Sequence, residues 1–238
     1  MQSRVLGARG AVAASYFDVD GTLVSTNLVH PTAFYLLNQG TPLKVARQLG
    51  RALMRAPAMA LAELVDRRMF NELLYSAYEG MSEDRILLLA EDAFEDVVRP
   101  SIYRGARDLV SRAREGQRKV VFISGALDGI VRHLADHLGA DEIIANRLEM
   151  KDGIATGKLL RPVVAGPLKA SIIRDHARRD GHDLDDCYAF SDSYSDLPML
   201  SVVGHPAAVN PDARLLLLAR AYSWPSFKLT RTGRKASA

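Results

Sequence analysis

Two aspartates separated by one residue, Asp18 and Asp20, follow directly after a short apolar run of the chain. Regular strand geometry would point both carboxylates the same way, and like charges so close resist joint ionisation. A bound cation or a proton on one of them relieves the repulsion, and a bend at Gly21 would let the two groups diverge. One carboxylate would then attack a substrate while the other donates a proton to the leaving group. Taken alone, the pair is equally compatible with a solvated turn.

A second acidic pair, Asp192 and Asp196, lies in a serine-rich stretch after another apolar run. Hard cations such as Mg²⁺ prefer carboxylate oxygens as ligands. If the two apolar runs are adjacent strands, Asp18 and Asp192 would together supply a magnesium site. The alternative is a turn that caps a helix near Leu197.

Phosphate-binding chemistry is suggested by two further places in the chain. Ser124 and Gly125 end an apolar run, and a hydroxyl with free backbone N–H groups at a helix start suits phosphate oxygens. Lys169 opens a helical pattern, where its charge would offset that of a phosphoryl group. The alternatives are an ordinary N-cap serine and a solvated lysine.

The elements that position these residues alternate along the chain. Apolar runs at residues 12–17, 119–124 and 187–191 predict buried strands. Helical patterns lie between them, at residues 105–115, 128–138 and 168–178. Strands that alternate with helices indicate a parallel sheet covered by helices, in which ligands bind at the carboxyl ends of the strands. All three runs end in the polar residues named above, so one site is expected.

Residues 27–100 have a different character, being rich in Ala, Leu, Met and Arg with helical periods and little strand signal. We interpret them as a helical cap, inserted into a core formed by residues 1–26 and 101–238. Residues 147–160 predict a hairpin around Asp152-Gly153, as a small flap beside the site. Residues 228–238 are basic and small, and are predicted to be a loose tail.

Composition and charge argue against several classes of protein. The 238 residues carry a net charge of +3, which suits an anionic ligand but is too small to indicate nucleic acid. One cysteine permits no intrachain disulfide, and no signal peptide or membrane span is recognisable, so a cytoplasmic protein is expected. The six histidines show no metal-ligand spacing.

The four segments in this order are far more specific than any one of them, and they resemble the haloacid dehalogenase superfamily of phosphatases. The first reads Asp-Val-Asp-Gly-Thr-Leu-Val, followed by the strand ending in Ser124, the helix-start Lys169 and Ser-Asp-x-x-x-Asp. Within the superfamily the chain resembles subfamily IB, which includes phosphoserine phosphatase, and a bacterial group of phosphoserine-phosphatase-like hydrolases. The likeness runs from Val12 to Trp224.

The resemblance implies a Rossmann-like parallel sheet with a helical C1-type cap after the first motif. It implies that Asp18 is a nucleophile that forms an aspartyl-phosphate, and that Asp20 protonates the leaving alcohol and then activates water. It also implies roles for the other matching residues. Ser124, Gly125 and Lys169 would bind phosphate; Asp18, the backbone carbonyl of Asp20, and Asp192 would bind Mg²⁺; Asp196 and Thr22 would support the site.

The cap departs from the phosphoserine phosphatase pattern. Asn27 stands where a glutamate commonly binds the substrate ammonium, and Leu74 aligns with a cap arginine that binds the carboxylate. Arg67 and Arg68 lie nearby and are candidate specificity residues together with Asn27. An amide cannot pair with an ammonium as a carboxylate does. We therefore expect a small-molecule or lipid-derived phosphomonoester, with phosphoserine as the alternative substrate.

Three further hypotheses remain open at this point. A basic stripe in the cap suggests peripheral contact with anionic membranes, although a solvated face over a cap core is the simpler explanation. The stripe consists of Lys44, Arg47, Arg51 and Arg55. The same fold could serve as a non-catalytic phosphate-binding module, or transfer its phosphoryl group to an alcohol instead of water. The oligomeric state is not predicted.

Overall fold

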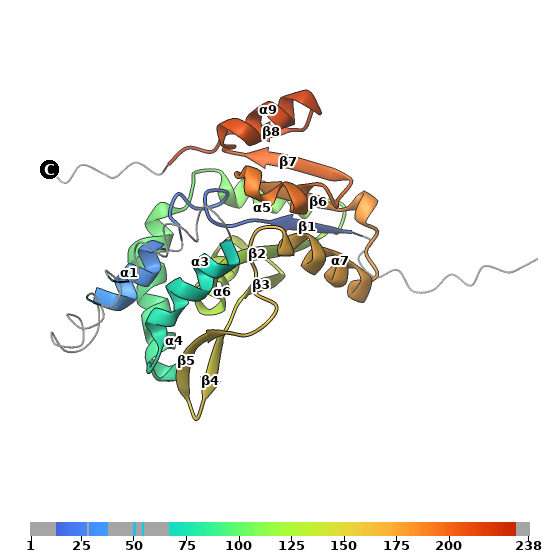
Figure 1. Ribbon diagram of the computed structural model, residues 1–238. Helices are drawn as coiled ribbons and strands as arrows, with labels where there is room; N and C mark the ends of the chain where they lie inside the picture. Colours follow the sequence, from blue (N-terminus) through green and yellow to red (C-terminus); the bar gives the residue numbers. More distant parts are fainter. Residues whose placement is uncertain (1–12, 28, 38–49, 51–53, 55–66, 232–238) are drawn as a thin grey trace, which may run out of the picture.

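A six-stranded parallel sheet forms the centre of the computed structural model, which describes residues 13–27, 29–37, 50, 54 and 67–231 (Figure 1). All neighbouring pairs run parallel, in the order β3-β2-β1-β6-β7-β8. The strands are β1 (Ala14–Phe17), β2 (Lys119–Leu127), β3 (Glu142–Asn146), β6 (Tyr188–Ser191), β7 (His205–Val209) and β8 (Ser226–Phe227). The predicted α/β fold class is confirmed.

Side chains of the central strands alternate between two apolar clusters, one on each face of the sheet. Phe17 and Phe122 point to one face, against α5 (Ala106–Ala113) and α6 (Asp128–Leu138). Tyr16 and Ile123 point to the other face. That face is covered by α7 (Leu168–Asp180), α8 (Leu197–Leu200) and α9 (Ala213–Ala221). A sheet buried on both faces needs such continuous apolar runs, which is why the sequence showed them.

The strand order reverses direction between β1 and β6, because β2 and β3 extend the sheet on one side and β7 and β8 on the other. In open α/β sheets the loops on either side of such a switch point part and leave a crevice at the carboxyl ends of the strands. The segments after β1 and β6 carry the two acidic pairs. The fold therefore places them at the same crevice.

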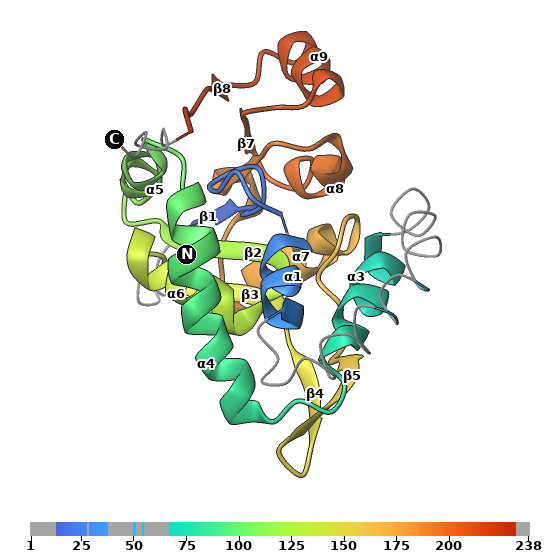
Figure 2. The same ribbon diagram turned by 90° about the vertical axis from the view of Figure 1, so that its left-hand side faces the viewer.

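Residues of the 27–100 segment that the structure describes are mainly helical. They form α1 (Val29–Leu37), α3 (Arg67–Tyr75), a 3₁₀ turn (Ser76–Tyr78), α4 (Glu83–Ala93), a π-helical turn (Phe94–Val98) and a 3₁₀ turn (Arg99–Ser101). Their apolar residues, such as Tyr78 and Leu89, belong to the same cluster as Phe17 of the sheet. Figures 1 and 2 show α1, α3 and α4 grouped at one side of the sheet.

The predicted hairpin forms from β4 (Leu148–Lys151) and β5 (Ile154–Leu159), with Asp152 and Gly153 both at positive φ. It is joined to the loop before α4 rather than placed over the cavity described below. Ala155 donates its backbone N–H to Met81 and accepts from Gly80, at 2.7 and 2.9 Å. The hairpin prediction is confirmed, but the expectation of a flap beside the site is wrong, since no hairpin residue lines that cavity.

Strands β3, β7 and β8 were not predicted, and β7 contains a proline. Pro206 is tolerated because of where its missing N–H would point. The N–H of His205 bonds to Cys187 next to β6, so the following nitrogen faces the β8 side. There β8 pairs only with Ala208 and Val209. In the described structure, no strand pairs with β7 at Pro206 on the β8 side, so the missing N–H of the proline removes no ladder hydrogen bond.

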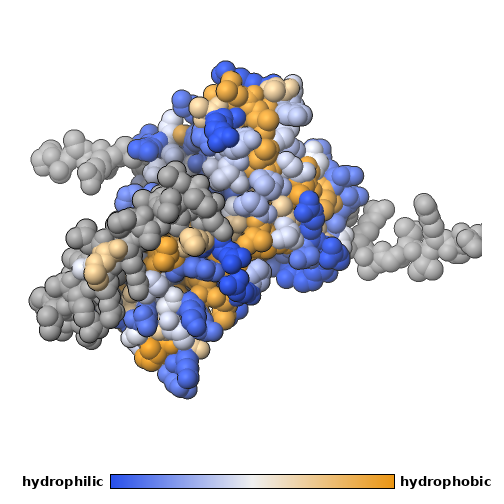
Figure 3. Space-filling model, in the orientation of Figure 1, coloured by the Kyte–Doolittle hydropathy of each residue, from blue (hydrophilic) through white to orange (hydrophobic). Residues whose placement is uncertain are grey.

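The tail from residue 228 is held to the core at least to residue 230, which corrects the expectation of a loose end for these residues. Leu229 donates its N–H to Asn210 Oδ1 at 2.8 Å, and Arg104 donates to the carbonyl of Thr230 at 2.8 Å. None of the helices among the described residues has the length and apolar character to cross a membrane. On the face drawn in Figure 3, apolar and hydrophilic patches are interspersed.

Candidate active site

The end of β1 is a tight turn that separates the first two carboxylates. Asp18 still pairs with β6, through its N–H to the carbonyl of Phe190 at 2.9 Å. The chain then folds back, with Leu23 N–H bonded to the carbonyl of Val19 and Gly21 at φ +83°. Asp18 is buried, while Asp20 is partly exposed and lines a cavity. The bend expected at Gly21 is present.

Lys169 bridges the first and last of the acidic residues. Its Nζ lies 2.5 Å from Asp18 Oδ1 and 2.8 Å from Asp196 Oδ2, and all three side chains are buried. Burial opposes the charge of Lys169, but the two carboxylates outweigh it and raise its pKa. Burial raises the pKa of Asp18, an effect that the charge of Lys169 opposes. Ser191 Oγ donates a further hydrogen bond to Asp196 at 2.9 Å.

Asp18 and Asp192 share one hydroxyl group. Thr22 Oγ1 lies 3.0 Å from Asp18 Oδ2 and 3.2 Å from Asp192 Oδ1. One hydroxyl proton cannot satisfy both carboxylates at once. Burial, followed by the charges of Asp18 and Asp196, raises the pKa of Asp192 to about 8. The carboxylate oxygens of Asp18 and Asp192 are therefore crowded together with too few hydrogen-bond donors. A hard divalent cation would take these oxygens as ligands and offset their negative charge.

The end of β2 contributes through its backbone as well as through a side chain. Ser124 is buried, accepts from Ala126 N–H at 3.0 Å, and lies 3.5 Å from Asp20 Oδ2. The carbonyl of Gly125 accepts hydrogen bonds from Tyr75 Oη at 3.0 Å and from Asn146 Nδ2 at 2.8 Å. Helix α3 and strand β3 therefore both hold this turn in place.

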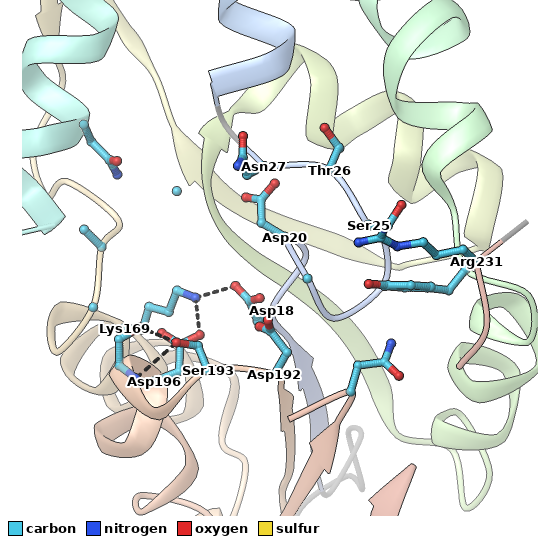
Figure 4. A pocket seen from close by; sticks show the side chains of 18 residues that line it. Asp18, Asp20, Ser25, Thr26, Asn27, Lys169, Asp192, Ser193, Asp196 and Arg231 are labelled. Atoms are coloured by element: carbon cyan, nitrogen blue, oxygen red, sulfur yellow. Dashed lines mark hydrogen bonds and ion pairs between the residues drawn. The ribbon is translucent and has the colours of Figure 1, made fainter. Parts of the chain in front are cut away.

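A cavity of about 380 Å³ opens above these groups (Figure 4). Such a volume suits a small molecule. Of the predicted site residues it is lined by Asp18, Asp20, Asn27, Gly125, Lys169, Asp192 and Asp196. Thr22 and Ser124 are not in its wall but contact residues that are. Sequence positions from 18 to 210 and beyond are thus brought to one place.

The helical segment contributes a residue that sequence reasoning missed. Arg68 does not line the cavity and lies 3.6 Å from Glu72 in an exposed ion pair, and the side chain of Arg67 is outside the described residues. Asn71, one helical turn on, lines it instead. Asn71 is 2% exposed and donates to the carbonyl of Val164 at 3.3 Å, while its Oδ1 has no hydrogen-bond partner among the residues that the structure describes. Which residue of α3 lines the cavity depends on the orientation of the helix, which the local sequence does not reveal.

Arg231 also lines the cavity and was assigned to the tail. Figure 4 shows it beside Ser25, on the other side of Asp20 from Lys169. It arrives because residues 226–230 pair with β7 and with Arg104. No feature of the local sequence signals this placement.

Comparisons with known proteins identify a family and related sequences. Residues 16–201 match the protein family described as haloacid dehalogenase-like hydrolase. A Streptomyces azureus protein named inhibition of morphological differentiation protein is 33% identical, over 89% of this chain and 76% of its own length. Phosphoserine phosphatase SerB1 of Mycobacterium tuberculosis is 32% identical, over 94% of this chain and 73% of its own length.

Solved structures show the same fold. A Bordetella pertussis Tohama I protein described as having unknown function superposes with a TM-score of 0.77 at 24% identity, covering 92% of this chain and 99% of its own. A substrate-bound phosphoserine phosphatase superposes with a TM-score of 0.65 at 20% identity, covering 92% and 94%. The family match and the related sequences named as phosphatases confirm the predicted enzyme class, a phosphatase-type hydrolase.

Proposed function

This chain belongs to the haloacid dehalogenase-like hydrolase family, and we propose that it is a magnesium-dependent phosphomonoesterase that works through a phospho-aspartate on Asp18. The observation that carries the proposal is the meeting of Asp18, Lys169 and Asp196 through contacts of 2.5 and 2.8 Å in the wall of a cavity that Asp20 also lines. Residues 27–100 are proposed to form a cap domain over a core of residues 1–26 and 101–238.

In the first step an oxygen of Asp18 attacks the phosphorus atom, and the bond from phosphorus to the ester oxygen breaks. Asp20 gives its proton to that oxygen, so that the alcohol leaves neutral. In the second step water attacks the phosphorus of the phospho-aspartate, Asp20 takes a proton from it, and inorganic phosphate and free Asp18 are released. Dividing hydrolysis into two displacements replaces one difficult step by two easier ones.

Lys169, Ser124 and the backbone at Gly125 are proposed to bind the phosphoryl oxygens, with Thr22 and Asp196 orienting Asp18 and Lys169. Asp18, Asp192 and the backbone carbonyl of Asp20 would hold Mg²⁺. When bound, the ion offsets negative charge on the phosphoryl group. The shared Thr22 hydroxyl and the raised pKa of Asp192 support a cation there.

The proposed substrate is a small or lipid-derived phosphomonoester. Among the lining residues that the structure describes, the cations are Lys169 and Arg231, and the α3 helix presents the amide of Asn71. Asn27 also lines the cavity as an amide. These amides suit hydroxyl or amide groups of a substrate better than an ammonium group. Phosphoserine remains the alternative substrate because two related sequences are named phosphoserine phosphatase.

The membrane hypothesis rests on residues 44–55, which lie outside the described residues apart from two isolated positions, 50 and 54. It stays a prediction. Phosphoryl transfer to an alcohol would use the same residues as hydrolysis, and the phosphate-binding module would use the same cavity without turnover.

The test is phosphate release from a panel of monoesters, with and without Mg²⁺. The panel contains phosphoserine, sugar phosphates, nucleotides and lysophospholipid phosphates. Asp18→Asn is expected to lower kcat by at least ~10⁴-fold, as loss of a nucleophile does elsewhere. The matched control is Asp175→Asn, which alters an exposed aspartate of α7 paired with Arg178.

Magnesium-dependent turnover that survives in Asp175→Asn and is lost in Asp18→Asn would support the mechanism, and the best substrate would identify the class. Equal turnover in both variants would contradict the nucleophile assignment. No turnover by folded, magnesium-loaded protein would favour the binding module. An added alcohol acceptor that lowers phosphate release without slowing substrate loss would indicate transfer.

A further inference from the structure

Two histidines that are six residues apart meet at the far end of α7 from Lys169. Helix α7 ends at Asp180, and Gly181 adopts a left-handed conformation at φ +72°. This turns the chain back, so that His182 N–H bonds to the carbonyl of Ala177 at 2.9 Å. The imidazole of His182 then stacks on that of His176, with ring centroids 5.8 Å apart. The spacing is not a recognised ligand pattern and arises from the helix C-terminus.

The Nε2 atoms of both rings face the carboxylate of Asp180. His176 Nε2 lies 3.6 Å and His182 Nε2 3.9 Å from Asp180 Oδ2. His176 Nε2 also lies 3.4 Å from Oε2 of Glu142, at the start of β3. Four ligand atoms held tetrahedrally at about 2.0–2.1 Å from one ion are about 3.3–3.4 Å apart. The ligand atoms of His176, Asp180 and His182 lie within 4.8 Å of one another, so a modest side-chain adjustment would let them enclose an ion.

The burial of His176 means that solvent cannot satisfy the polar atoms of its ring. Both imidazole side chains are 2% exposed. His176 Nδ1 contacts Tyr16 Oη at 2.9 Å, whereas the buried Nε2 makes no hydrogen bond of normal geometry to any described residue, and its contacts with Glu142 and Asp180 are 3.4 and 3.6 Å long. A buried polar atom without a well-formed hydrogen bond destabilises the fold. The Tyr16 contact fixes the ring orientation, as partners of metal-ligating histidines commonly do. Burial also lowers the pKa of His176, which favours the neutral form.

Two cations already neutralise the carboxylates. Arg179 binds Glu142 Oε1 at 2.8 Å and Asp180 Oδ1 at 2.6 Å, leaving the other oxygens toward the histidines. Lys119 Nζ lies against those other oxygens, 2.8 Å from Asp180 Oδ2 and 2.5 Å from Glu142 Oε2. Its side chain is 27% exposed. Because it reaches solvent, Lys119 can withdraw and leave its place to another cation.

We propose that His176, Asp180 and His182 form a second metal site, which takes a borderline transition ion such as Zn²⁺ in place of the Lys119 ammonium. Two imidazoles and one carboxylate are a zinc-type donor set, unlike the all-oxygen set proposed at the cavity. Along α7, the ligands His176 and Asp180 lie about 10 and 16 Å from Lys169. The ion would hold the turn after α7 to the last turns of the helix and would take no part in the phosphatase reaction.

The site is tested on the full chain with Co²⁺ as a spectroscopic probe, in excess Mg²⁺ so that the oxygen site stays filled. Four-coordinate cobalt with nitrogen ligands absorbs strongly in the visible range, and octahedral oxygen-bound cobalt does not. Zn²⁺ is then added to displace it. The variants are His182→Gln and Lys119→Met, with His205→Gln as a control histidine outside the cluster and Asp192→Asn as a control at the cavity.

The expected result is one equivalent of cobalt with the four-coordinate spectrum, displaced by Zn²⁺. His182→Gln should weaken binding by about tenfold or more, a scale that loss of even a supporting contact reaches. Lys119→Met should tighten it, because the competing charge is gone. His205→Gln and Asp192→Asn should leave the spectrum unchanged. Absence of the spectrum in both wild type and Lys119→Met, or equal binding in His182→Gln, would overturn the proposal.

Discussion

The carboxylate of Asp192 lies directly against the backbone of Gly21. A Cβ atom built at Gly21 would come within 2.1 Å of Asp192 Oδ2, far inside van der Waals contact. The two residues come from the loops after β1 and β6, on either side of the switch point of the sheet. Glycine is therefore required at this position for two reasons. It adopts a φ of +83° without strain, and its lack of a Cβ atom leaves space for the carboxylate of Asp192.

Gly21→Ala is expected to lower kcat by ~10²-fold, because a displacement of about 1 Å in a catalytic group has that effect. Gly80→Ala is the matched control, since Gly80 has the same φ of +83° and, in the described part of the chain, nothing lies within 4 Å of its Cβ position. Both variants should lose about 1–2 kcal/mol of stability from the left-handed backbone. Steady-state kinetics and urea unfolding separate the two effects, and equal activity in both variants would argue against the Asp192 contact.

Removal of the buried cation should destabilise the fold. Lys169→Met leaves Asp18 and Asp196 facing each other without a counter-charge, and breaking a buried pair costs about 3–5 kcal/mol. The control is Lys119→Met, which also removes a lysine between two carboxylates but at a partly exposed place, where a loss of about 1 kcal/mol or less is expected. Urea unfolding at pH 7 measures both. Phosphatase activity should disappear only in Lys169→Met, and a smaller stability loss there than in Lys119→Met would contradict the description.

The stability of the metal-free protein should fall as pH rises. The pKa of Asp192 is about 8 in the folded chain, raised by burial and by the charges of Asp18 and Asp196, against about 3.9 when unfolded. Folding therefore favours the protonated form, and the resulting stability is complete below about pH 4 and lost as pH approaches 8. Added Mg²⁺ should reduce this loss, because it stabilises the ionised carboxylate.

Thermal unfolding between pH 5 and 8, in EDTA and in Mg²⁺, measures this dependence. Asp192→Asn removes the titrating group and should flatten the profile in EDTA. It should also remove most of the magnesium effect. Identical profiles for wild type and Asp192→Asn would show that other groups cause the dependence.

Arg231 should affect substrate affinity rather than chemistry. Its guanidinium lines the cavity beyond Asp20, so it is placed to contact a second anionic group of a substrate. Arg231→Gln is expected to raise KM about fivefold for such substrates, corresponding to about 1 kcal/mol for an exposed ion pair, with kcat nearly unchanged. Arg220→Gln, on the exposed side of α9, is the control. An unchanged KM for every substrate would remove Arg231 from the binding site.

Local pattern was sufficient for the elements that are apolar and long. The predicted helix at residues 128–138 coincides with α6, and the runs at residues 12–17, 119–124 and 187–191 correspond to β1, β2 and β6. Strand β7 was missed because it contains Pro206, which its position beside the short β8 makes harmless. Whether a proline is tolerated depends on the neighbouring strand, which local sequence does not reveal.

The sequence by itself determined the fold class and the identity of the acidic residues, because a buried parallel sheet requires apolar runs and its switch point requires polar residues where those runs end. Tertiary structure alone decided which other side chains reach the same space. Asn71 lines the cavity because of the way α3 is oriented, and Arg231 lines it because β8 pairs with β7. His176 stacks on His182 because the chain turns back at Gly181. Each of these depends on how elements pack against one another. Packing involves residues distant in the sequence, so no local spacing encodes it.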